Sequence, residues 1–367
     1  MLKPSLISLP LPLPSLRPRF LPSPRAEMSS SGAETTSSSP SISPLPENRV
    51  VVGCGAVSVD YLATVASFPK PDDKIRSVSM KVEGGGNTGN ALTCAARLGL
   101  KPKIISKVAN DASGRNILAE LEADGVDTSH MVVSEQGISS FTYVIVDNQT
   151  KTRTCINTPG YPPMVPEELS QTSLFSALDD ASLVYFDVRL HETALVVAEE
   201  AWTSAQSTPS ALVSLLLRLP NIKFVIITLG EKGCIMFERS IIDASEKEET
   251  DVESLLESLK QRVDGNVTTP TCISSKSDLR ISADGIGAVS GRLLIGTAEV
   301  IPPSELIDTT GAGDAFIGAV LYSLCAGFPP EKMLPFASQV AAAGCRALGA
   351  RSGLPWRSDP RLAQFWL

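Results

Sequence analysis

Residues 308–316 read Asp-Thr-Thr-Gly-Ala-Gly-Asp-Ala-Phe, and they lead without a break into the apolar run A-F-I-G-A-V-L-Y-S-L. A glycine-rich turn that opens a helix directs backbone N–H groups and the positive end of the helix dipole at one point. The amides of residues 311–314 therefore suit the negative charge that develops on a phosphoryl group during transfer. Asp314, at the helix start, is placed to accept a proton from a substrate hydroxyl. The alternative is that Asp314 only caps a helix that follows a glycine turn.

A second glycine-rich stretch, residues 83–91, reads Glu-Gly-Gly-Gly-Asn-Thr-Gly-Asn-Ala and also opens a predicted helix. Glycines let the backbone approach a polyhydroxyl ligand closely, and asparagine side chains offer both donors and acceptors. A glycine turn capped by Asn would explain the same residues without a ligand. The stretch does not match the G-x-G-x-x-G pattern of a dinucleotide site or the G-K-[ST] ending of a P-loop, so both of these sites are disfavoured.

The segments around these stretches alternate between strand and helix patterns. An apolar run ending in glycines predicts a buried strand and its exit turn over residues 49–60. Further strands are predicted at 103–108, 183–186 and 224–229, with helices at 90–98, 113–123, 192–205, 210–217, 315–325 and 334–348. This alternation predicts an α/β fold: a doubly wound, mostly parallel sheet with helices on both faces.

Two regions do not fit a parallel sheet. Residues 74–82 alternate between apolar and polar side chains, and residues 139–157 read as two strands joined by a turn. We expect these regions to form a small β lid over a binding site. Ligands in doubly wound folds bind outside the carboxyl ends of the strands, so a lid there would cover them.

Composition narrows the class of protein. The chain has 367 residues, of which 43% are hydrophobic and 20% charged, as in a globular protein rather than a disordered one. The net charge of −8 makes nucleic acid and anionic membranes unfavourable partners. Seven scattered cysteines without a C-x-x-C pair indicate reduced thiols, and two histidines leave little scope for a His-rich metal site.

The N-terminal region differs from the remainder. The first 26 residues carry four basic side chains and no acidic one, and prolines interrupt their apolar run, so they cannot form a membrane helix. A basic, Ser-rich leader of this kind is typical of a plastid transit peptide, although a merely disordered tail fits it too. We expect residues 1–48 to be a disordered leader and linker before a folded domain at 49–367. Met28 offers an internal start, whose product would be cytoplasmic.

The two glycine-rich stretches, in this order and spacing, resemble the paired signatures of the pfkB carbohydrate kinase family over about residues 49–360. The resemblance implies a ribokinase-like fold and ATP-dependent phosphorylation of a hydroxyl on a sugar or nucleoside. It also implies Mg²⁺, a monovalent cation near Asp308, and a homodimer formed through the lid. The triple glycine before Asn87 leans towards ketohexokinase-like members rather than ribokinase.

The resemblance also assigns roles to residues of this chain. Asp314 matches the catalytic base, and the turn before it matches the anion hole, which comprises Gly311, Ala312 and Gly313. Asp60 matches the acid that holds substrate hydroxyls, although it could be only a turn acid at a strand end. The sugar-binding turn is matched by Gly85, Gly86 and Asn90, and the strand end that faces ATP is matched by Thr228 and Gly230.

The sequence departs from the family pattern in two places. The stretch between Gly230 and Asp308 is long, and its acidic, helix-patterned part at 246–264 predicts a surface insertion near 240–290. Between Arg189 and Phe224 we find two helix patterns but no strand between them. The N-x-x-E segment that organises magnesium in the family is also missing between 185 and 230, so metal ligands remain unassigned. The alternative to an active kinase is therefore a catalytically impaired isoform that acts by binding or is non-functional.

Overall fold

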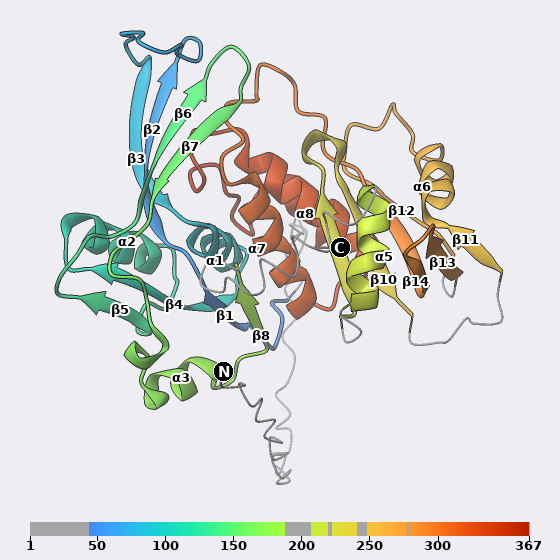
Figure 1. The fold of residues 1–367 in the computed structure, drawn as a ribbon, viewed down its shortest axis with the longest axis horizontal. Coiled ribbons are helices and arrows are strands. Elements are labelled where there is room, and N and C mark those ends of the chain that lie inside the picture. The colour runs from blue at the N-terminus through green and yellow to red at the C-terminus, as the bar shows by residue number, and fades with distance from the viewer. Residues whose placement is uncertain (1–43, 188–206, 219–221, 241–247, 277–278, 367) are drawn as a thin grey trace, which may run out of the picture. The chain divides into compact units, whose positions relative to one another are not determined.

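A four-stranded parallel sheet forms the first half of the fold in this computed structural model (Figure 1). The structure describes residues 44–187, 207–218, 222–240, 248–276 and 279–366, all within one unit, Ile42–Leu367. The predicted leader and the predicted helix at 192–205 lie outside these residues. The sheet has the order β5-β4-β1-β8 and comprises β1 (Val50–Cys54), β4 (Lys101–Ala109), β5 (Met131–Ser134) and β8 (Leu183–Phe186).

Helices cover both faces of this sheet, as the alternation of strand and helix patterns predicts. Successive side chains of a strand point to opposite faces. Val51 of β1 packs in a core with α1 (Asn87–Arg97), α2 (Ala112–Ala123) and the helices α7 and α8 described below. Its neighbour Val52 packs on the other side with Ala177 of α3 (Gln171–Leu178). The centre of the sheet is therefore buried between two helical layers, which explains the apolar run of β1.

A separate four-stranded sheet forms the lid. Its order is β3-β2-β6-β7, with β2 (Ser58–Val65), β3 (Ser79–Gly85), β6 (Phe141–Asp147) and β7 (Arg153–Thr158). The predicted lid regions at 74–82 and 139–157 both contribute, but the first strand begins only at residue 79. The lid also gains β2, so Asp60 lies inside a strand rather than in the turn that the sequence indicated. Pairing with β3 and β6 on its two sides explains why this segment is extended.

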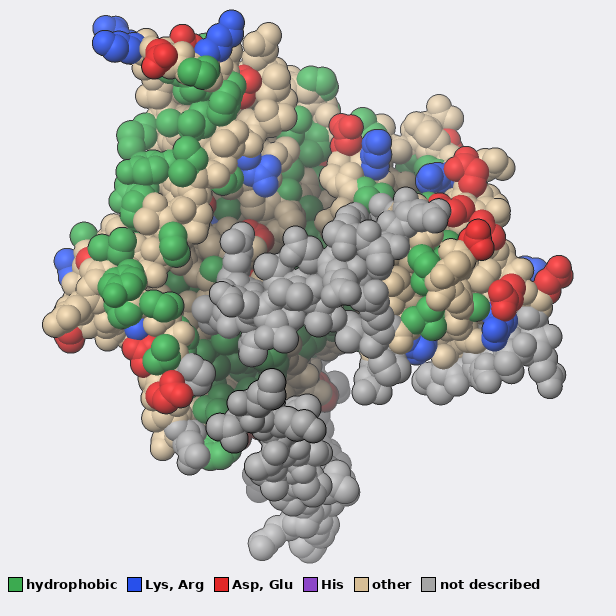
Figure 2. Space-filling model, viewed as in Figure 1, with side chains coloured by type: hydrophobic (Ala, Val, Ile, Leu, Met, Phe, Trp, Pro, Cys, Tyr) green, Lys and Arg blue, Asp and Glu red, His purple; other side chains and the backbone are tan. Residues whose placement is uncertain are grey.

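The two faces of the lid have different chemistry because of strand alternation. The cross-strand pairs Thr142–Asn157 and Val144–Cys155 share one face. The intervening pair Tyr143–Ile156 belongs to the outer face, where both side chains are exposed. Figure 2 shows hydrophobic side chains gathered over the lid strands. The inner face thus carries polar side chains at Thr142 and Asn157 and a buried apolar cluster of Leu62, Val144 and Val146, whereas the outer face is apolar and exposed.

The second half of the fold contains a six-stranded sheet. Five strands have the order β11-β13-β14-β10-β9, and β12 pairs with β14; all pairs but β11–β13 are antiparallel. Its helices are α5 (Thr208–Arg218) and α6 (Val252–Lys260). The strands are β9 (Phe224–Thr228), β10 (Cys234–Arg239), β11 (Glu249–Asp251), β12 (Cys272–Ser274), β13 (Leu279–Ala283) and β14 (Gly287–Gly296).

The described residues of the range 240–290 include β11, β12, β13 and the start of β14, which pair within this sheet, so these parts are not the surface insertion that the sequence predicts. The predicted acidic helix exists as α6, and its apolar side chains Leu256 and Leu259 are buried. They pack in one core with Phe237, Ile281 and Val289. Within α6 the acidic residues Glu253 and Glu257 are exposed, and the acidic pattern in the sequence concealed the buried side of the helix.

The two sheets do not join at β8 and β9. β8 ends the order of the parallel sheet, and β9 ends the order of the second sheet. Between these strands, the part of the chain that the structure describes contains the helix α5 and no strand. Phe186 of β8 is 57% exposed, which is unusual for an apolar strand residue in the middle of an α/β fold. The interruption lies where the sequence pattern lacks a strand.

Two C-terminal helices complete the fold. α7 (Ala312–Cys325) and α8 (Pro330–Gly344) pack on each other, and α7 packs on α1. Both begin three to four residues before their predicted starts, because Gly311 and Pro329 end the preceding turns. An aromatic cluster fixes their outer ends and comprises Tyr322, Phe328, Phe336, Phe365 and Trp366. Among the helices of the described ranges, none is long and apolar enough to cross a membrane.

The burial of Ile281 gives a test of the second sheet. Its side chain is fully buried in the core between β13 and α6. We expect Ile281→Ala to lower the free energy of unfolding by about 2–5 kcal/mol, since it leaves a cavity in a packed core. The matched control is Val267→Ala, whose side chain is 39% exposed and whose effect should stay within about 0.5 kcal/mol. Urea unfolding measures both, and equal effects would contradict a core in this range.

Candidate active site

A buried carboxylate shapes the turn before α7. Asp308 is fully buried and accepts hydrogen bonds from the amide and the hydroxyl of Thr310, at 2.9 and 2.8 Å. Its other oxygen accepts from the amide of Gly349 at 2.9 Å. The amide of Asp308 in turn donates to the carbonyl of Cys345. These bonds tie the turn to the segment that follows α8, so the start of α7 is held from both sides.

Gly311 occupies a position that only glycine tolerates well. Its φ is 73°, in the left-handed region, and a Cβ there would lie 2.5 Å from the Cβ of Ala350. α7 begins at the next residue, and the first amides of a helix have no carbonyl partner within it. The amide of Ala312 donates to Thr309 over a long 3.3 Å. The predicted anion hole thus rests mainly on the amides of Gly311, Gly313 and Asp314.

Asp314 is joined to the second glycine-rich stretch through Asn90. The amide nitrogen Nδ2 of Asn90 donates to Oδ2 of Asp314 at 3.0 Å, across 224 residues of sequence. Oδ1 of the same side chain accepts from Nε of Arg351 at 3.0 Å. If the amide nitrogen and oxygen of Asn90 were exchanged, its oxygen would face the carboxylate of Asp314 and its nitrogen would face the N–H of Arg351. Both neighbours therefore fix the orientation of Asn90.

The environment of Asp314 suits a base near neutral pH. Burial raises the pKa of its carboxyl to about 6, against the lowering effect of the hydrogen bond from Asn90. The negative charges of Asp60 and Asp187 raise this pKa further, and the positive charge of Arg153 lowers it. A general base works best when its pKa is close to the working pH.

The glycines of the second stretch make room for side chains of the site. A Cβ on Gly85 would lie 2.1 Å from Oδ1 of Asp60, and one on Gly86 would lie 2.5 Å from the backbone of Val57. Asp60 itself is 6% exposed and accepts from the hydroxyl of Ser58 at 3.0 Å. Burial raises the pKa of Asp60, and the hydrogen bond from Ser58 and the charge of Arg351 oppose this rise.

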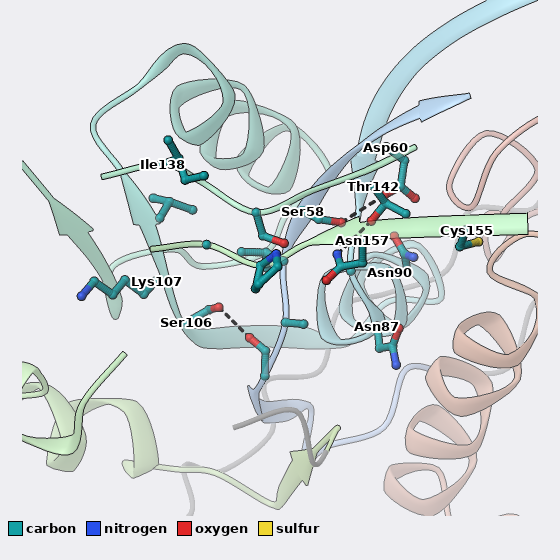
Figure 3. Close-up of a pocket in the computed structure, with 18 of the residues that line it drawn as sticks. Ser58, Asp60, Asn87, Asn90, Ser106, Lys107, Ile138, Thr142, Cys155 and Asn157 are labelled. Carbon is teal, nitrogen blue, oxygen red and sulfur yellow. Dashed lines mark hydrogen bonds between the residues drawn. The ribbon is translucent and has the colours of Figure 1, made fainter. Parts of the chain in front are cut away.

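Two cavities meet at the turn before α7. One, of about 540 Å³, is lined at this turn by Thr310, Gly311 and Asp314. It also contains Asp60 and Asn90, together with the inner face of the lid. Figure 3 shows Asp60, Asn90, Thr142 and Asn157 close together at one end of this cavity, with Ile138 and Lys107 at the other.

The second cavity, of about 650 Å³, lies on the other side of the turn. It is lined there by Thr309, Ala312 and Gly313, and across from them by Thr228 and Gly230. Apolar side chains form much of its wall, among them Val300, Ile301, Phe316, Ala341 and Ala342. The residues singled out from the sequence therefore lie around one turn and line two cavities, except for Gly85, which lines neither.

The lid contributes a positive charge to the turn. Arg153, on the inner face of β7, donates from Nη1 to the hydroxyl of Thr309 at 2.9 Å. It also lines the cavity that contains Asp314. An arginine at this place compensates the negative charges of Asp60 and Asp314, which lie in the same cavity.

The described residues do not form a protein cage for a metal ion. Within the ranges that the structure describes, no three His, Cys, Asp or Glu side chains come together in a way that could hold one. A divalent ion held by at most one or two carboxylates must take its other ligands from water or phosphate. The donor groups of the described residues do not match a resident metal site, and the proposed reaction does not depend on one.

Sequence reasoning missed three residues of the site: Arg153, Asn157 and Arg351. Arg153 and Arg351 belong to the site through contacts with distant segments, at Thr309 and Asn90, and Asn157 lines the cavity from β7 and donates to Thr142 of the neighbouring strand. The alternation along 153–157 was a usable signal, since it places residues 153, 155 and 157 on one side of a strand. No local pattern marks Arg351, which follows an ordinary glycine turn.

Two sugar kinases are similar to this chain over most of its length. A mouse ribokinase is 24% identical over 334 residues, which cover 87% of this chain and 96% of that protein. A mouse ketohexokinase is 25% identical over 307 residues, which cover 83% and 98%. Because the two identities are similar, they favour neither ribokinase nor ketohexokinase, and they do not test the ketohexokinase-like character that the triple glycine indicates.

The fold is also that of solved ribokinases. The structure of Arabidopsis thaliana ribokinase with ribose and ATP matches 88% of this chain and 99% of that one, with a TM-score of 0.56 and 16% identity. The family model for the pfkB carbohydrate kinases matches residues 48–208 and 284–357, and it omits residues 209–283, which contain most of α5 and the strands β9–β13. This chain belongs to the pfkB family of carbohydrate kinases.

Proposed function

We propose that this protein transfers a phosphoryl group from ATP to a hydroxyl of a sugar or nucleoside. One observation carries the proposal: two cavities meet at a single turn, and neighbouring residues of that turn line different cavities. Thr310, Gly311 and Asp314 line one, while Ala312 and Gly313 line the other. Two substrates bound in these cavities would meet at the amides of the turn. A phosphotransferase needs this arrangement, whereas a binding protein does not.

Each part of the turn has a task in this reaction. Asp314 accepts the proton of the attacking hydroxyl, and its raised pKa suits that step. The amides at the start of α7 and the helix dipole stabilise the charge on the phosphoryl oxygens as it transfers. Phosphoryl transfer depends mainly on positioning and electrostatics, so a rigid turn held by Asp308 is the appropriate scaffold.

The acceptor cavity favours a neutral ligand with a polar and an apolar end. Asp60, Asn90 and Asn157 offer hydrogen-bond partners for hydroxyls near the base. The far end is lined by Val108, Ile138, Tyr161, Pro162 and Met164. Lys107 at that end is neutralised by Glu168 at 2.6 Å, so it does not favour a second phosphate. A nucleoside fits both ends, while a free monosaccharide fits the polar one.

On the nucleotide side, Thr228 and Gly230 would face the ribose and phosphates of ATP, and the apolar wall would hold the adenine. Magnesium would enter as the ATP complex, with phosphate oxygens as its main ligands. A monovalent cation near Asp308 would lie beside a carboxylate that already accepts three hydrogen bonds.

The alternative is an impaired isoform, which the interruption between β8 and β9 and the missing N-x-x-E segment favour. An ATP-consumption assay on the full chain, with ribose, fructose and adenosine as acceptors and magnesium present or absent, separates the two. Acceptor-dependent turnover supports the kinase. A cooperative thermal melt without turnover on any acceptor would favour the impaired form.

Replacing the base should abolish catalysis without harming the fold. We expect Asp314→Asn to lower kcat roughly 10²- to 10⁴-fold, because the amide cannot accept the proton. The pKa of Asp314 is higher in the folded chain than the ordinary value of 3.8. The free energy of unfolding of the wild-type protein therefore falls as the pH rises from 3.8 through about 6, because the folded state holds the carboxyl protonated more strongly than the unfolded state does. The variant should therefore melt at the same temperature or higher.

The wild-type enzyme should show a matching dependence on pH. The base must be ionised, so kcat/KM should fall as pH drops through about 6. Steady-state kinetics between pH 5 and 8 and thermal melts of both proteins check this pair of expectations. Near-normal turnover of the Asn variant would remove Asp314 from the mechanism.

Asp60 should affect the acceptor and not the nucleotide. Its carboxylate lines the acceptor cavity, and it is absent from the residues that line the other cavity. Hydrogen bonds to a charged group contribute on the order of 1.5–3 kcal/mol, so Asp60→Ala should raise the acceptor KM by about tenfold or more. The KM of ATP serves as the internal control. Unchanged acceptor affinity in a calorimetric titration would refute this role.

We also propose that the outer face of the lid is a contact between two copies of the chain. Exposed apolar side chains on this face include Met80, Val82, Tyr143 and Ile156. A contiguous apolar face of this kind is typical of an interface in a soluble protein.

A charge on this face should disrupt such a dimer. We expect Ile156→Asp to halve the mass that light scattering measures after gel filtration. Phe175→Asp on α3, at an apolar position that is more exposed than Ile156, should leave the mass unchanged. A wild-type chain that is monomeric at micromolar concentration would exclude the dimer.

Finally, we propose plastid targeting by the leader, which a fluorescent fusion of residues 1–48 would test.

A further inference from the structure

Arg351 is a buried arginine that the reaction described above does not use. Its side chain is 3% exposed, and it lies in the segment after α8. Nε donates to Oδ1 of Asn90 and Nη2 to the carbonyl of Gly85, both at 3.0 Å. Nη1 lies 3.6 Å from the carboxylate of Glu120, beyond hydrogen-bonding distance, and has no hydrogen-bond partner.

The surroundings of this guanidinium are built to admit it. A Cβ on Gly84 would lie 2.1 Å from Nη1, and a Cβ on Gly89 would lie 2.6 Å from Nη2. Two glycines of the second stretch are therefore required by the arginine rather than by a ligand. Burying a charged side chain is costly unless it is compensated, so a position kept open for one indicates a specific use.

The contacts of Arg351 lead to the base in two steps. Arg351 holds Oδ1 of Asn90, and Nδ2 of Asn90 holds Oδ2 of Asp314. The planar guanidinium also donates a hydrogen bond to the carbonyl of Gly85, so it joins the end of lid strand β3 to helix α1. Rotation of the Asn90 amide would break both of its bonds, and the guanidinium prevents that rotation.

We propose that Arg351 positions the catalytic base, by fixing the Asn90 amide that orients the carboxylate of Asp314. The inference rests on the proposed function, in which Asp314 takes the proton of the acceptor hydroxyl. Arg351 does not line either cavity, so it acts through Asn90 and touches neither substrate. It is a positioning residue.

Loss of this arginine should impair turnover and leave nucleotide binding intact. Displacing a reacting group by about 1 Å can cost on the order of 10²-fold in rate, so we expect kcat of Arg351→Met to fall by about that factor. The KM of ATP should not change, because the nucleotide cavity is lined by other residues.

The pH profile gives a second readout that a merely structural role would not move. The charged groups around the guanidinium are Glu83, Glu120, Asp60, Asp124 and Arg97, and Asp314 itself is faced by Asp60, Asp187 and Arg153. Without Arg351, Asp314 loses a fixed donor to its ionised form, which raises its pKa. The acid limb of kcat/KM should therefore move to higher pH.

A matched control separates positioning from general destabilisation. Arg292 of β14 pairs with Glu238 of β10 and with Glu331 of α8, and it lines neither cavity. Arg292→Met should lower the melting temperature while keeping kcat and the pH profile. Arg351→Lys keeps the charge but not the two-pronged donor, so its kcat should stay low.

A second route covers the case in which Arg351→Met does not fold. Gly84→Ala places a methyl group against Nη1 and should displace the guanidinium from Asn90, with the same loss of kcat and the same pH shift. Gly265→Ala is its control, since a Cβ there meets nothing within 4 Å.

The outcomes distinguish this inference from the proposed function. Normal kcat and an unmoved acid limb in both Arg351→Met and Gly84→Ala, beside an inactive Asp314→Asn, would overturn the positioning role alone. An active Asp314→Asn would overturn the proposed base and the inference with it. A kcat loss that Arg292→Met reproduces at equal loss of stability would also refute positioning.

Discussion

The carboxylate of Asp308 is the constraint on which the site depends. It is fully buried; one oxygen accepts from the amide and the hydroxyl of Thr310 in the turn, and the other accepts from the amide of Gly349 in the segment after α8. A buried charge with so many donors cannot move without losing several of them at once. The turn before α7 is therefore rigid, and its position sets where the two cavities meet. Catalysis by electrostatics requires such donors to be in place before the charge develops.

The lid follows from a simpler rule, the alternation of side chains along a strand. Thr142, Arg153 and Asn157 face the cavity because Tyr143 and Ile156 face outward. One short sheet can thus close a polar site and present an apolar surface. The arrangement also brings Arg153 to the turn, where its hydrogen bond to Thr309 connects the lid to the start of α7.

The fold class and both glycine-rich turns could be predicted from the sequence, because glycine needs and helix starts are local. For this reason the sequence alone singles out Asp314, Gly311 and Gly86 as candidate site residues. The strands within 240–290 escaped because they are short and because acidic residues hide the buried side of α6. Asp60 was placed in a turn because pairing with two neighbouring strands, which makes it part of a sheet, leaves no local trace. Arg351 could not be found at all, since its partners are Gly85 and Asn90, more than 260 residues away along the chain.

The space that Gly84 leaves for Arg351 has an evolutionary consequence. A methyl group at position 84 and a guanidinium at position 351 exclude each other, so neither residue can change alone without loss. Lineages that replace the arginine by a shorter residue release position 84 from selection for glycine. The two positions should then vary together across descendants of this gene, and the first glycine of the run would reflect the arginine at position 351 rather than the identity of the sugar.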